Sequence, residues 1–220
     1  MSRCLLLLAV IVIPAMDMAQ YDIGLRLGAA EPTPVTSSFR DRVSHRPSPV
    51  FGVSIIHGGD GTGNFRLSLD FLQRVFDLRQ LNASGDRMEL LRMRQSFLFL
   101  STEVRWPLNA GSSVFFDLGP MIGAQISEKA NGMDMPTGNY RDTIGPMPVD
   151  ERTVGPLRIR EVRLRLGPSV DIPVDPRLHL TGVVGIAPGW SDAYRGRGRF
   201  NVDVQLMASV YWSLRRPKPP

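Results

Sequence analysis

The chain has 220 residues, and its 26 Lys and Arg residues outnumber its 21 Asp and Glu residues, which gives a formal net charge of +5 at pH 7. Such a basic balance is compatible with nucleic-acid binding, but the export signal described next argues against nucleic acid as a partner. The length that follows this signal fits one domain, and no later segment is apolar enough to predict a transmembrane helix.

Residues 1–19 have the pattern of a secretory signal peptide. Arg3 supplies a positive charge, and the apolar run CLLLLAVIVI follows it. A membrane-spanning helix needs roughly twenty apolar residues, so this run is too short to be one. Cleavage is expected after Ala15 or after Ala19. Because Cys4 is the only cysteine, the mature chain is predicted to have no disulfide, thiolate metal site or cysteine nucleophile.

After the signal, apolar and polar residues alternate in eight segments. The last segment shows this best, because apolar residues occupy every second position from Val202 to Leu214, and Met207 alone interrupts the polar positions between them. Successive side chains of a strand point to opposite faces, so the pattern indicates strands with one apolar and one polar face. Each apolar face has the length of a tilted strand that crosses a membrane. The phase slips near Leu72, where we expect a β-bulge.

The connections between these segments alternate in length. Long, polar connections are predicted at residues 32–48, 82–96, 128–156 and 191–200. Short connections rich in Gly, Pro, Asn and Asp are predicted at residues 59–64, 107–112 and 173–177. Outer-membrane β-barrels have short periplasmic turns and long external loops. The expected fold is all-β, an eight-stranded antiparallel up-and-down transmembrane β-barrel over residues 20–214, with a periplasmic tail at residues 215–220.

The polar face of the predicted strands is densely charged. It carries seven acids and five arginines, namely Asp22, Asp70, Glu103, Asp117, Glu161, Asp171, Asp203, Arg26, Arg66, Arg105, Arg163 and Arg165. Buried charges are tolerated only when they are paired, so the near balance predicts a closed polar lumen with an ion-pair network. The apolar face is nearly uncharged, as contact with lipid requires. A soluble barrel with the apolar face inside is the alternative.

Large aromatic residues fall near the ends of the predicted strands. They are Tyr21, Phe65, Trp106, Trp190 and Trp212. Amphipathic rings are enriched at membrane–water interfaces, so these residues are predicted to form an aromatic girdle. In a soluble barrel the same rings would fill the core.

The opening segment YDIGLRLG and the closing segment VQLMASVYWSL, together with the export signal and eight strands, resemble the small bacterial outer-membrane β-barrel family of OmpX/OmpA-like and PorT-like proteins. The resemblance covers nearly all of the mature chain. It implies an integral outer-membrane protein with a structural, adhesion or secretion-accessory role, and it implies no cofactor and no catalytic motif. One departure is that such barrels often end in an aromatic residue, whereas this chain continues past Leu214.

Other candidate sites have simpler interpretations. The glycine-rich residues 58–63 lack the helix and the lysine of a phosphate-binding loop and are predicted to form a hairpin turn. His45, His57 and His179 are scattered, and no metal site is expected. An outer-membrane lipase would need an outward-facing histidine and serine close together, and no serine lies two residues from His57, the outward candidate. The chain is therefore predicted not to be an enzyme.

Two predicted loops are candidate contact surfaces. Arg195, Arg197 and Arg199 can meet the acidic sugars or phosphates of lipopolysaccharide through charge-assisted hydrogen bonds, or can belong to a plain solvated loop. The loop at residues 128–156 is the predicted surface for a protein partner, because external loops on a rigid barrel carry function. The sequence thus predicts a non-enzymatic barrel in outer-membrane lipid with a lumen plugged by side chains. The alternatives are a narrow transport channel and a lipid-modifying enzyme.

Overall fold

The computed structural model describes residues 21–34, 42–58, 64–81, 87–109, 111, 113–137, 145–194 and 197–214. The predicted signal peptide (residues 1–19) and the predicted tail (residues 215–220) lie outside these residues.

Every regular element in the described part of the chain is a β-strand. The strands are β1 (Tyr21–Pro34), β2 (Arg42–His45), β3 (Ser48–Gly58), β4 (Asn64–Leu81), β5 (Arg87–Pro107), β6 (Val114–Pro136), β7 (Met147–Asp175), β8 (Leu178–Tyr194) and β9 (Arg197–Ser213). Among the described residues there is no helix that is long and apolar enough to span a membrane.

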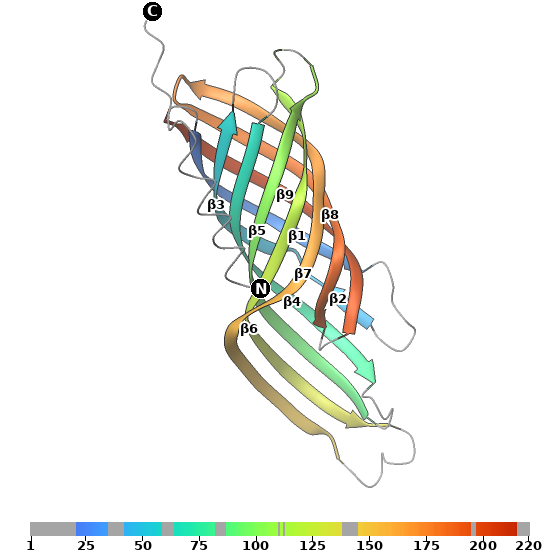
Figure 1. Cartoon of the computed structure of the whole chain (residues 1–220). Helices are drawn as coiled ribbons and strands as arrows, with labels where there is room; N and C mark the ends of the chain where they lie inside the picture. The colour runs from blue at the N-terminus through green and yellow to red at the C-terminus, as the bar shows by residue number, and fades with distance from the viewer. Residues whose placement is uncertain are drawn as a thin grey trace, which may run out of the picture.

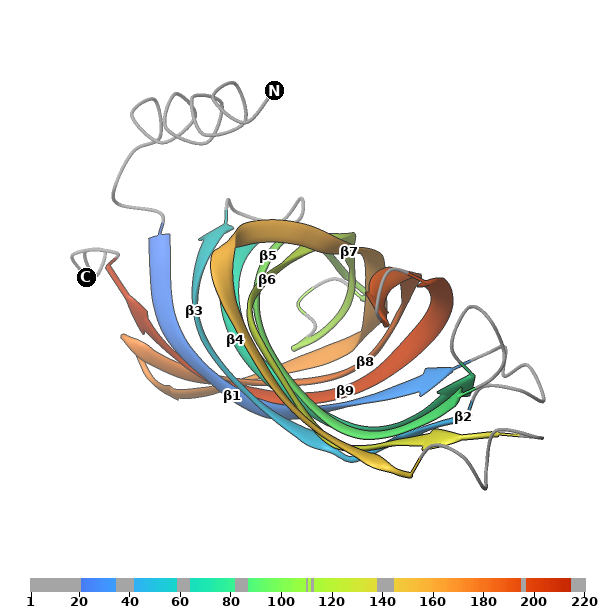
Figure 2. The ribbon, with the colours of Figure 1, turned by 90° about the horizontal axis from the view of Figure 1, so that it is seen from below.

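The strands form one closed antiparallel sheet. The order is β2-β4-β3-β1-β9-β8-β7-β6-β5, and β4 also pairs with β5. The first and last strands lie side by side, with Ile23 opposite Trp212, so the curved sheet of Figure 2 has no open seam between β1 and β9.

The short strand β2 is the outer part of the same barrel strand as β3. His45 pairs with Phe76, and Val50 pairs with Leu72. The four residues 46–49 therefore stand opposite the three residues 73–75 of β4. One extra residue on one strand is the arrangement of a β-bulge. With β2 and β3 counted together, the ring has eight strands, and the predicted fold class is confirmed.

Side chains alternate between the two faces along each barrel strand. In β1, Asp22 and Arg26 are buried while Leu25 and Leu27 are exposed. The predicted polar faces point into the barrel, and the predicted apolar faces point out.

The bulge predicted near Leu72 is not in β4 itself but in the neighbouring segment that joins β2 to β3. β4 pairs with β5 without a break along its whole length, and Leu72, Arg74, Phe76 and Leu78 are all buried on the inward face. The sequence pattern of β4 changes there because the interior accepts apolar side chains, while the register of β4 with β5 stays the same.

Four strands continue well beyond the others. At the lower end of Figure 1, β4, β5, β6 and β7 project past the ends of β8 and β9. The β6–β7 ladder runs to Asp134 and Met147. We call these projecting segments, with β2 beside them, the external extension; they comprise residues 42–45, 75–81, 87–94, 129–136 and 147–152.

The predicted extent of the long connections therefore needs correction. Residues 32–48 contain the end of β1, all of β2 and the start of β3. Much of residues 82–96 and most of residues 128–156 are strand, and residues 191–200 contain the ends of β8 and β9. Beyond the hydrocarbon both faces of a strand can meet water, so paired strands there need no apolar alternation. The short connections fall between strands but are narrower than predicted: β3 ends at Gly58 and β4 begins at Asn64, and β5 ends at Pro107 and β6 begins at Val114. β7 continues to Asp175, so only residues 176–177 of the predicted connection 173–177 join it to β8. Residues 59–63 lie outside the described residues, so the hairpin turn there stays a prediction.

Close strand contacts generate a stability prediction. A Cβ atom added at Gly119 would overlap the carbonyl oxygen of Thr102, whereas one at Gly182 would meet only Cγ1 of Val170, at 3.5 Å. We expect Gly119→Ala to lower the free energy of unfolding by about 1–3 kcal/mol because overpacking moves the backbone. The control Gly182→Ala should change it by less than about 0.5 kcal/mol. Urea unfolding of the detergent-folded protein measures both, and equal midpoints would contradict the packing.

Candidate functional site

The outer wall of the barrel is apolar. Large exposed side chains include Ile23, Leu25, Leu27, Phe51, Val53, Leu69, Leu100, Val104, Val162, Leu164, Val184, Ile186, Leu206 and Val210. A contiguous apolar surface on this scale is not a feature of soluble monomers. The wall is suited to the hydrocarbon of a membrane, so the soluble arrangement with this face inside does not apply.

The predicted girdle residues lie towards the ends of this wall. Phe65, Trp106 and Trp212 are exposed near the end that holds the short turns, and Trp190 is exposed near the opposite end. Tyr21 is half-buried, and its ring lies 5.1 Å from that of His57.

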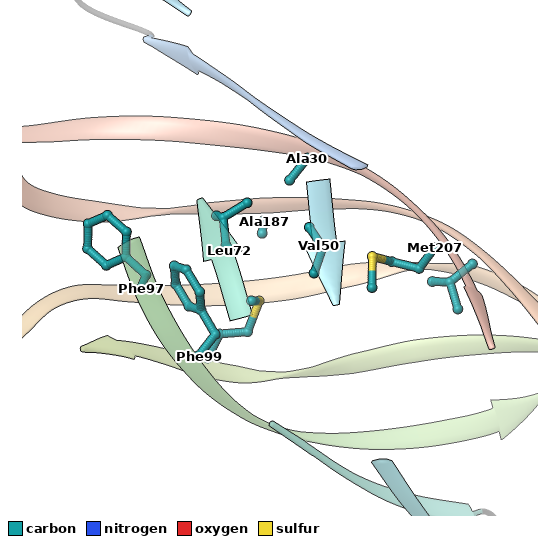
Figure 3. Close-up of a cluster of buried hydrophobic side chains, with 9 residues drawn as sticks. Ala30, Val50, Leu72, Phe97, Phe99, Ala187 and Met207 are labelled. Carbon is teal, nitrogen blue, oxygen red and sulfur yellow. The ribbon is translucent and has the colours of Figure 1, made fainter. Parts of the chain in front are cut away.

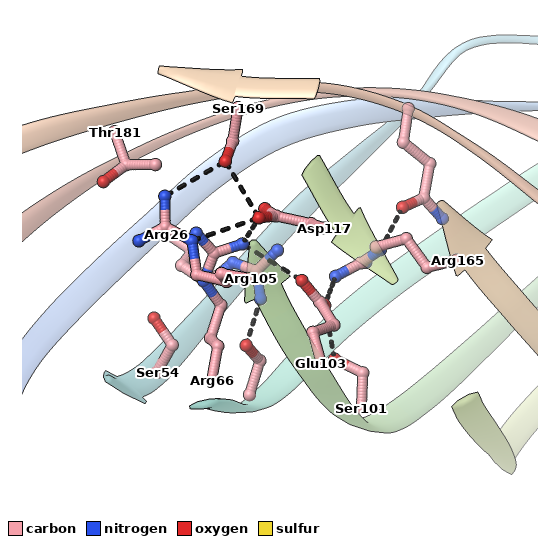
Figure 4. A network of polar contacts seen from close by, with 12 residues as sticks. Arg26, Ser54, Arg66, Ser101, Glu103, Arg105, Asp117, Arg165, Ser169 and Thr181 are labelled. Atoms are coloured by element: carbon pink, nitrogen blue, oxygen red, sulfur yellow. Dashed lines mark hydrogen bonds and ion pairs between the residues drawn. The ribbon is translucent and has the colours of Figure 1, made fainter. Parts of the chain in front are cut away.

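Eight charged side chains inside the barrel form one continuous series, which we call the ion-pair chain. Positive and negative groups alternate along it in the order Arg26, Asp70, Arg165, Glu103, Arg66, Asp117, Arg105 and Asp171. Figure 4 shows its centre, where the Glu103 carboxylate forms ion pairs with two arginines. Its oxygens lie 3.0 Å from Nη1 of Arg66 and 2.6 Å from Nη1 of Arg165. The residues come from five strands, so the chain crosses the lumen.

Four further charges form a closed set, which we call the ion-pair ring. Arg163 lies 2.8 Å from Glu161 and 3.1 Å from Asp203. Arg74 closes the ring, because it pairs with Glu161 and lies 3.2 Å from Asp203. All four side chains are almost completely buried.

Both sets are electrically balanced. The ion-pair chain contains four arginines and four acids, and the ion-pair ring contains two of each. An isolated charge in such surroundings costs several kcal/mol, and breaking a buried pair leaves its partner uncompensated. The arrangement therefore holds opposite walls of the lumen together by charge.

The lumen also contains apolar side chains, which corrects the expectation of a polar interior. Figure 3 shows a buried cluster that includes Leu72, Phe97, Phe99 and Met207. On β4, Leu72 lies between Asp70 of the ion-pair chain and Arg74 of the ion-pair ring. A second buried cluster lies farther out, made of Phe76, Leu78, Leu91, Met93 and Ala130. Along β4, charged and apolar side chains thus follow one another on the inward face, and we call the cluster around Leu72 the apolar layer.

The structure brings eleven of the twelve predicted lumen charges into these two sets. Asp22 is buried but forms no ion pair with any other described residue. Arg74 belongs to the ion-pair ring but escaped prediction. The sequence spacing could have revealed it. Arg66, Asp70 and Arg74 are each four residues apart along β4, so their side chains share one face of the strand.

Asp22 lies in a hollow at the end of the barrel that holds the short turns. The hollow has a volume of about 420 Å³, and its lining includes Arg105, Asp171 and His179. The His179 ring stacks on Tyr211 at 5.1 Å. The described residues hold no cluster of three His, Cys, Asp or Glu side chains fit for a metal ion.

The predicted arginine loop is only partly described. Arg195 lies outside the described residues, while Arg197 and Arg199 belong to β9, where their backbones pair with Tyr194 and Ser191. Their side chains are outside the description, so binding of an anion by this loop stays a prediction.

Comparison with known proteins identifies no family from the sequence. No protein-family model matches the chain, and no curated protein matches it. Solved structures do match. Neisserial surface protein A has a TM-score of 0.47 at 11% identity, with 88% of this chain and 97% of that chain covered. Ail of Yersinia pestis has a TM-score of 0.42 at 11% identity, covering 87% and 97%.

A third match is OprG of Pseudomonas aeruginosa, with a TM-score of 0.39 at 10% identity and coverage of 88% and 96%. These likenesses concern the fold alone. The ring of eight strands, the apolar outer wall and the charged interior are those of a small β-barrel of the outer-membrane type, as the sequence predicts, with lipid around its wall.

Breaking the ion-pair chain at its centre should destabilise the barrel. Glu103→Gln removes the charge that Arg66 and Arg165 share, so we expect the free energy of unfolding to fall by about 3–5 kcal/mol. The double variant R66Q/E103Q restores neutrality and should lose less than the sum of the two single changes. Urea midpoints of the detergent-folded variants provide the measurement.

The matched control is Asp77→Asn in the external extension. Asp77 lies 3.0 Å from Arg92, but both side chains are largely exposed, so the cost should stay below about 1 kcal/mol. Similar losses for Glu103→Gln and Asp77→Asn would show that burial of the ion-pair chain does not govern stability.

Proposed function

We propose that the chain is a non-enzymatic protein of the bacterial outer membrane whose lumen is closed by side chains and whose role is carried by its external surface. The observation that supports this most directly is the pair of charge-balanced sets that cross the lumen, with apolar side chains between them. The role is structural, adhesive or accessory to secretion.

The geometry of the lumen favours a plug over a channel. An eight-stranded barrel has an interior just wide enough for side chains to fill. Arg74 of β4 reaches Asp203 of β9, and Arg66 of β4 reaches Asp117 of β6. A solute that crossed the barrel would have to separate such pairs and displace the apolar layer, at the cost of buried, unpaired charges.

The external extension is the surface proposed to meet partners. It continues the barrel wall beyond the apolar band, and it includes the paired outer ends of β6 and β7, which belong to the segment at residues 128–156 that is expected to contact a protein. Outer-membrane lipid, including lipopolysaccharide, is the proposed partner of the wall and of the exposed arginines. No cofactor is part of this proposal.

The proposal assigns no catalytic role to the histidines. His57 lies beside the Tyr21 ring, and His179 stacks on Tyr211. Tyr211 in turn shares a hydrogen bond of 2.6 Å with the Ser54 hydroxyl. These contacts give both rings a packing role at the turn-bearing end of the barrel.

The proposal predicts a closed barrel that does not conduct. The protein should fractionate with the outer membrane and change its mobility between unboiled and boiled gel samples. In planar bilayers, the heat-modifiable protein should give no stable single-channel steps, because the ion-pair chain and the ion-pair ring occlude the lumen.

Three results would contradict this proposal. Recovery in the soluble periplasm without detergent would exclude the membrane barrel. Steady conductance that changes in Arg163→Ala or Glu103→Ala would favour the narrow transport channel, because these residues line the proposed plug. A change in lipid A on overexpression would favour the lipid-modifying enzyme.

A further inference from the structure

A row of positive charge crosses three neighbouring strands of the external extension. Arg94 of β5 pairs with Lys129 of β6, and Lys129 pairs with Arg152 of β7. Residues directly opposite each other in an antiparallel sheet project from the same face, with Cβ atoms about 4.5–5.5 Å apart. All three side chains are exposed. We call these three residues the cationic row.

The row lies on the outward face of the wall. The β4–β5 ladder has no register break between the barrel and the extension. Arg94 is separated from Leu98 and Leu100 by even numbers of residues, so its side chain shares their lipid-facing side. The cationic row therefore faces the surroundings of the barrel and not its lumen.

The position of the row along the wall follows from the same ladder. Moving outward, Phe71 pairs with Leu98, then Gln73 with Ser96, then Val75 with Arg94. The wall thus changes from apolar to uncharged polar to cationic in steps of two residues, or about 6–7 Å of strand each. This places the cationic row just beyond the apolar band, at the level of the head groups of the external leaflet.

Nearby acids leave most of this charge uncompensated. Asp150 lies 3.7 Å from Lys129, with both side chains exposed. Asp77, one step farther out, is shared by Arg92 and Arg46. Among the described residues, no acid forms an ion pair with Arg94 or Arg152. Like charges directly opposite each other destabilise a sheet, so the row is a place where an external anion would be stabilising.

Two register shifts produce the row. Phe97 pairs with Gln125, and the same register continued outward would place Arg94 opposite Glu128. Because the register shifts by one residue between Ser96 and Phe97, Arg94 stands opposite Lys129 instead. Gln125 pairs with Arg158, and continuing that register would bring Lys129 opposite Val154. Because the register shifts between Gln125 and Ser127, Lys129 stands opposite Arg152 instead. Each irregularity therefore replaces a neutral or favourable neighbour with a like charge.

We propose that the cationic row binds the phosphate groups of glycolipids in the external leaflet, as found on lipid A. The proposal deepens the proposed function and rests on it, because the row reaches head groups only if the barrel spans the outer membrane. Strands lie about 4.7–4.9 Å apart, so the three side chains can surround one phosphate or bridge two. Arginine and lysine donate charge-assisted hydrogen bonds to phosphate oxygens. The head-group level favours a lipid phosphate over a soluble anion.

The test measures binding of bisphosphorylated lipid A to the whole exported protein in detergent, by native mass spectrometry. The row variant is R94Q/K129Q/R152Q. The matched control, R79Q/R158Q/R177Q, removes three exposed arginines that lie outside the row. We expect the row variant to weaken binding by about 10-fold or more. The control should retain its affinity.

Two further probes identify the source of the phosphate. Lipid A without phosphates should bind wild type and row variant equally weakly. Inorganic phosphate, at concentrations equal to that of the lipid, should not displace lipid A. Equal affinity of wild type and row variant for phosphorylated lipid A, an equal loss in the control, or full displacement by inorganic phosphate would each overturn the proposal.

Heat-modifiability of the same preparations separates this inference from the proposed function. A row variant that stays heat-modifiable but loses lipid A supports the row. A heat-modifiable wild type that binds lipid A no better than its row variant overturns the row and leaves the closed barrel in place. A wild type without heat-modifiable mobility contradicts the barrel itself, and the head-group argument falls with it.

Discussion

Burial of charge in a narrow barrel is the constraint on which the rest of this structure depends. A charged group that loses its contact with water inside the barrel requires an opposite partner. The protein meets this requirement with two balanced sets, the ion-pair chain and the ion-pair ring. The partners come from different strands, so correct pairing also fixes strand register. A slip of one residue would turn the charges of a strand towards lipid.

The apolar layer between the two charged sets adds to this constraint. A surrounding of low polarity strengthens each ion pair and raises the cost of breaking it. Large side chains can occupy the lumen only where neighbouring strands leave room. An added Cβ at Gly52 would overlap the Asp70 carboxylate, and one at Gly123 would overlap the Phe99 ring. Glycine at these inward positions makes space for both kinds of layer.

The sequence predicted the barrel well because lipid imposes one apolar face on every spanning strand. Asp22, Arg26 and Asp203 could be assigned to the interior from alternation alone. Arg74 was missed because the apolar Leu72 beside it suggested a change of phase. The pairings themselves could not be predicted, since Arg74 meets Glu161 and Asp203 across 87 and 129 residues of sequence. Such contacts depend on turns and bulges that periodicity does not reveal.

Beyond the hydrocarbon, lipid no longer imposes an apolar face, so the alternation that predicts strands is lost. Residues 128–156 look like a loop in the sequence because no apolar face repeats there, yet backbone pairing continues through most of them. For the same reason the cationic row has no sequence signature, since Arg94, Lys129 and Arg152 become neighbours only through the register of three strands. The interior charges of this fold form balanced ion pairs, whereas like charges aligned on the outer face add nothing to its stability. That contrast is why the row is better explained by a ligand at the membrane surface than by the folding of the barrel.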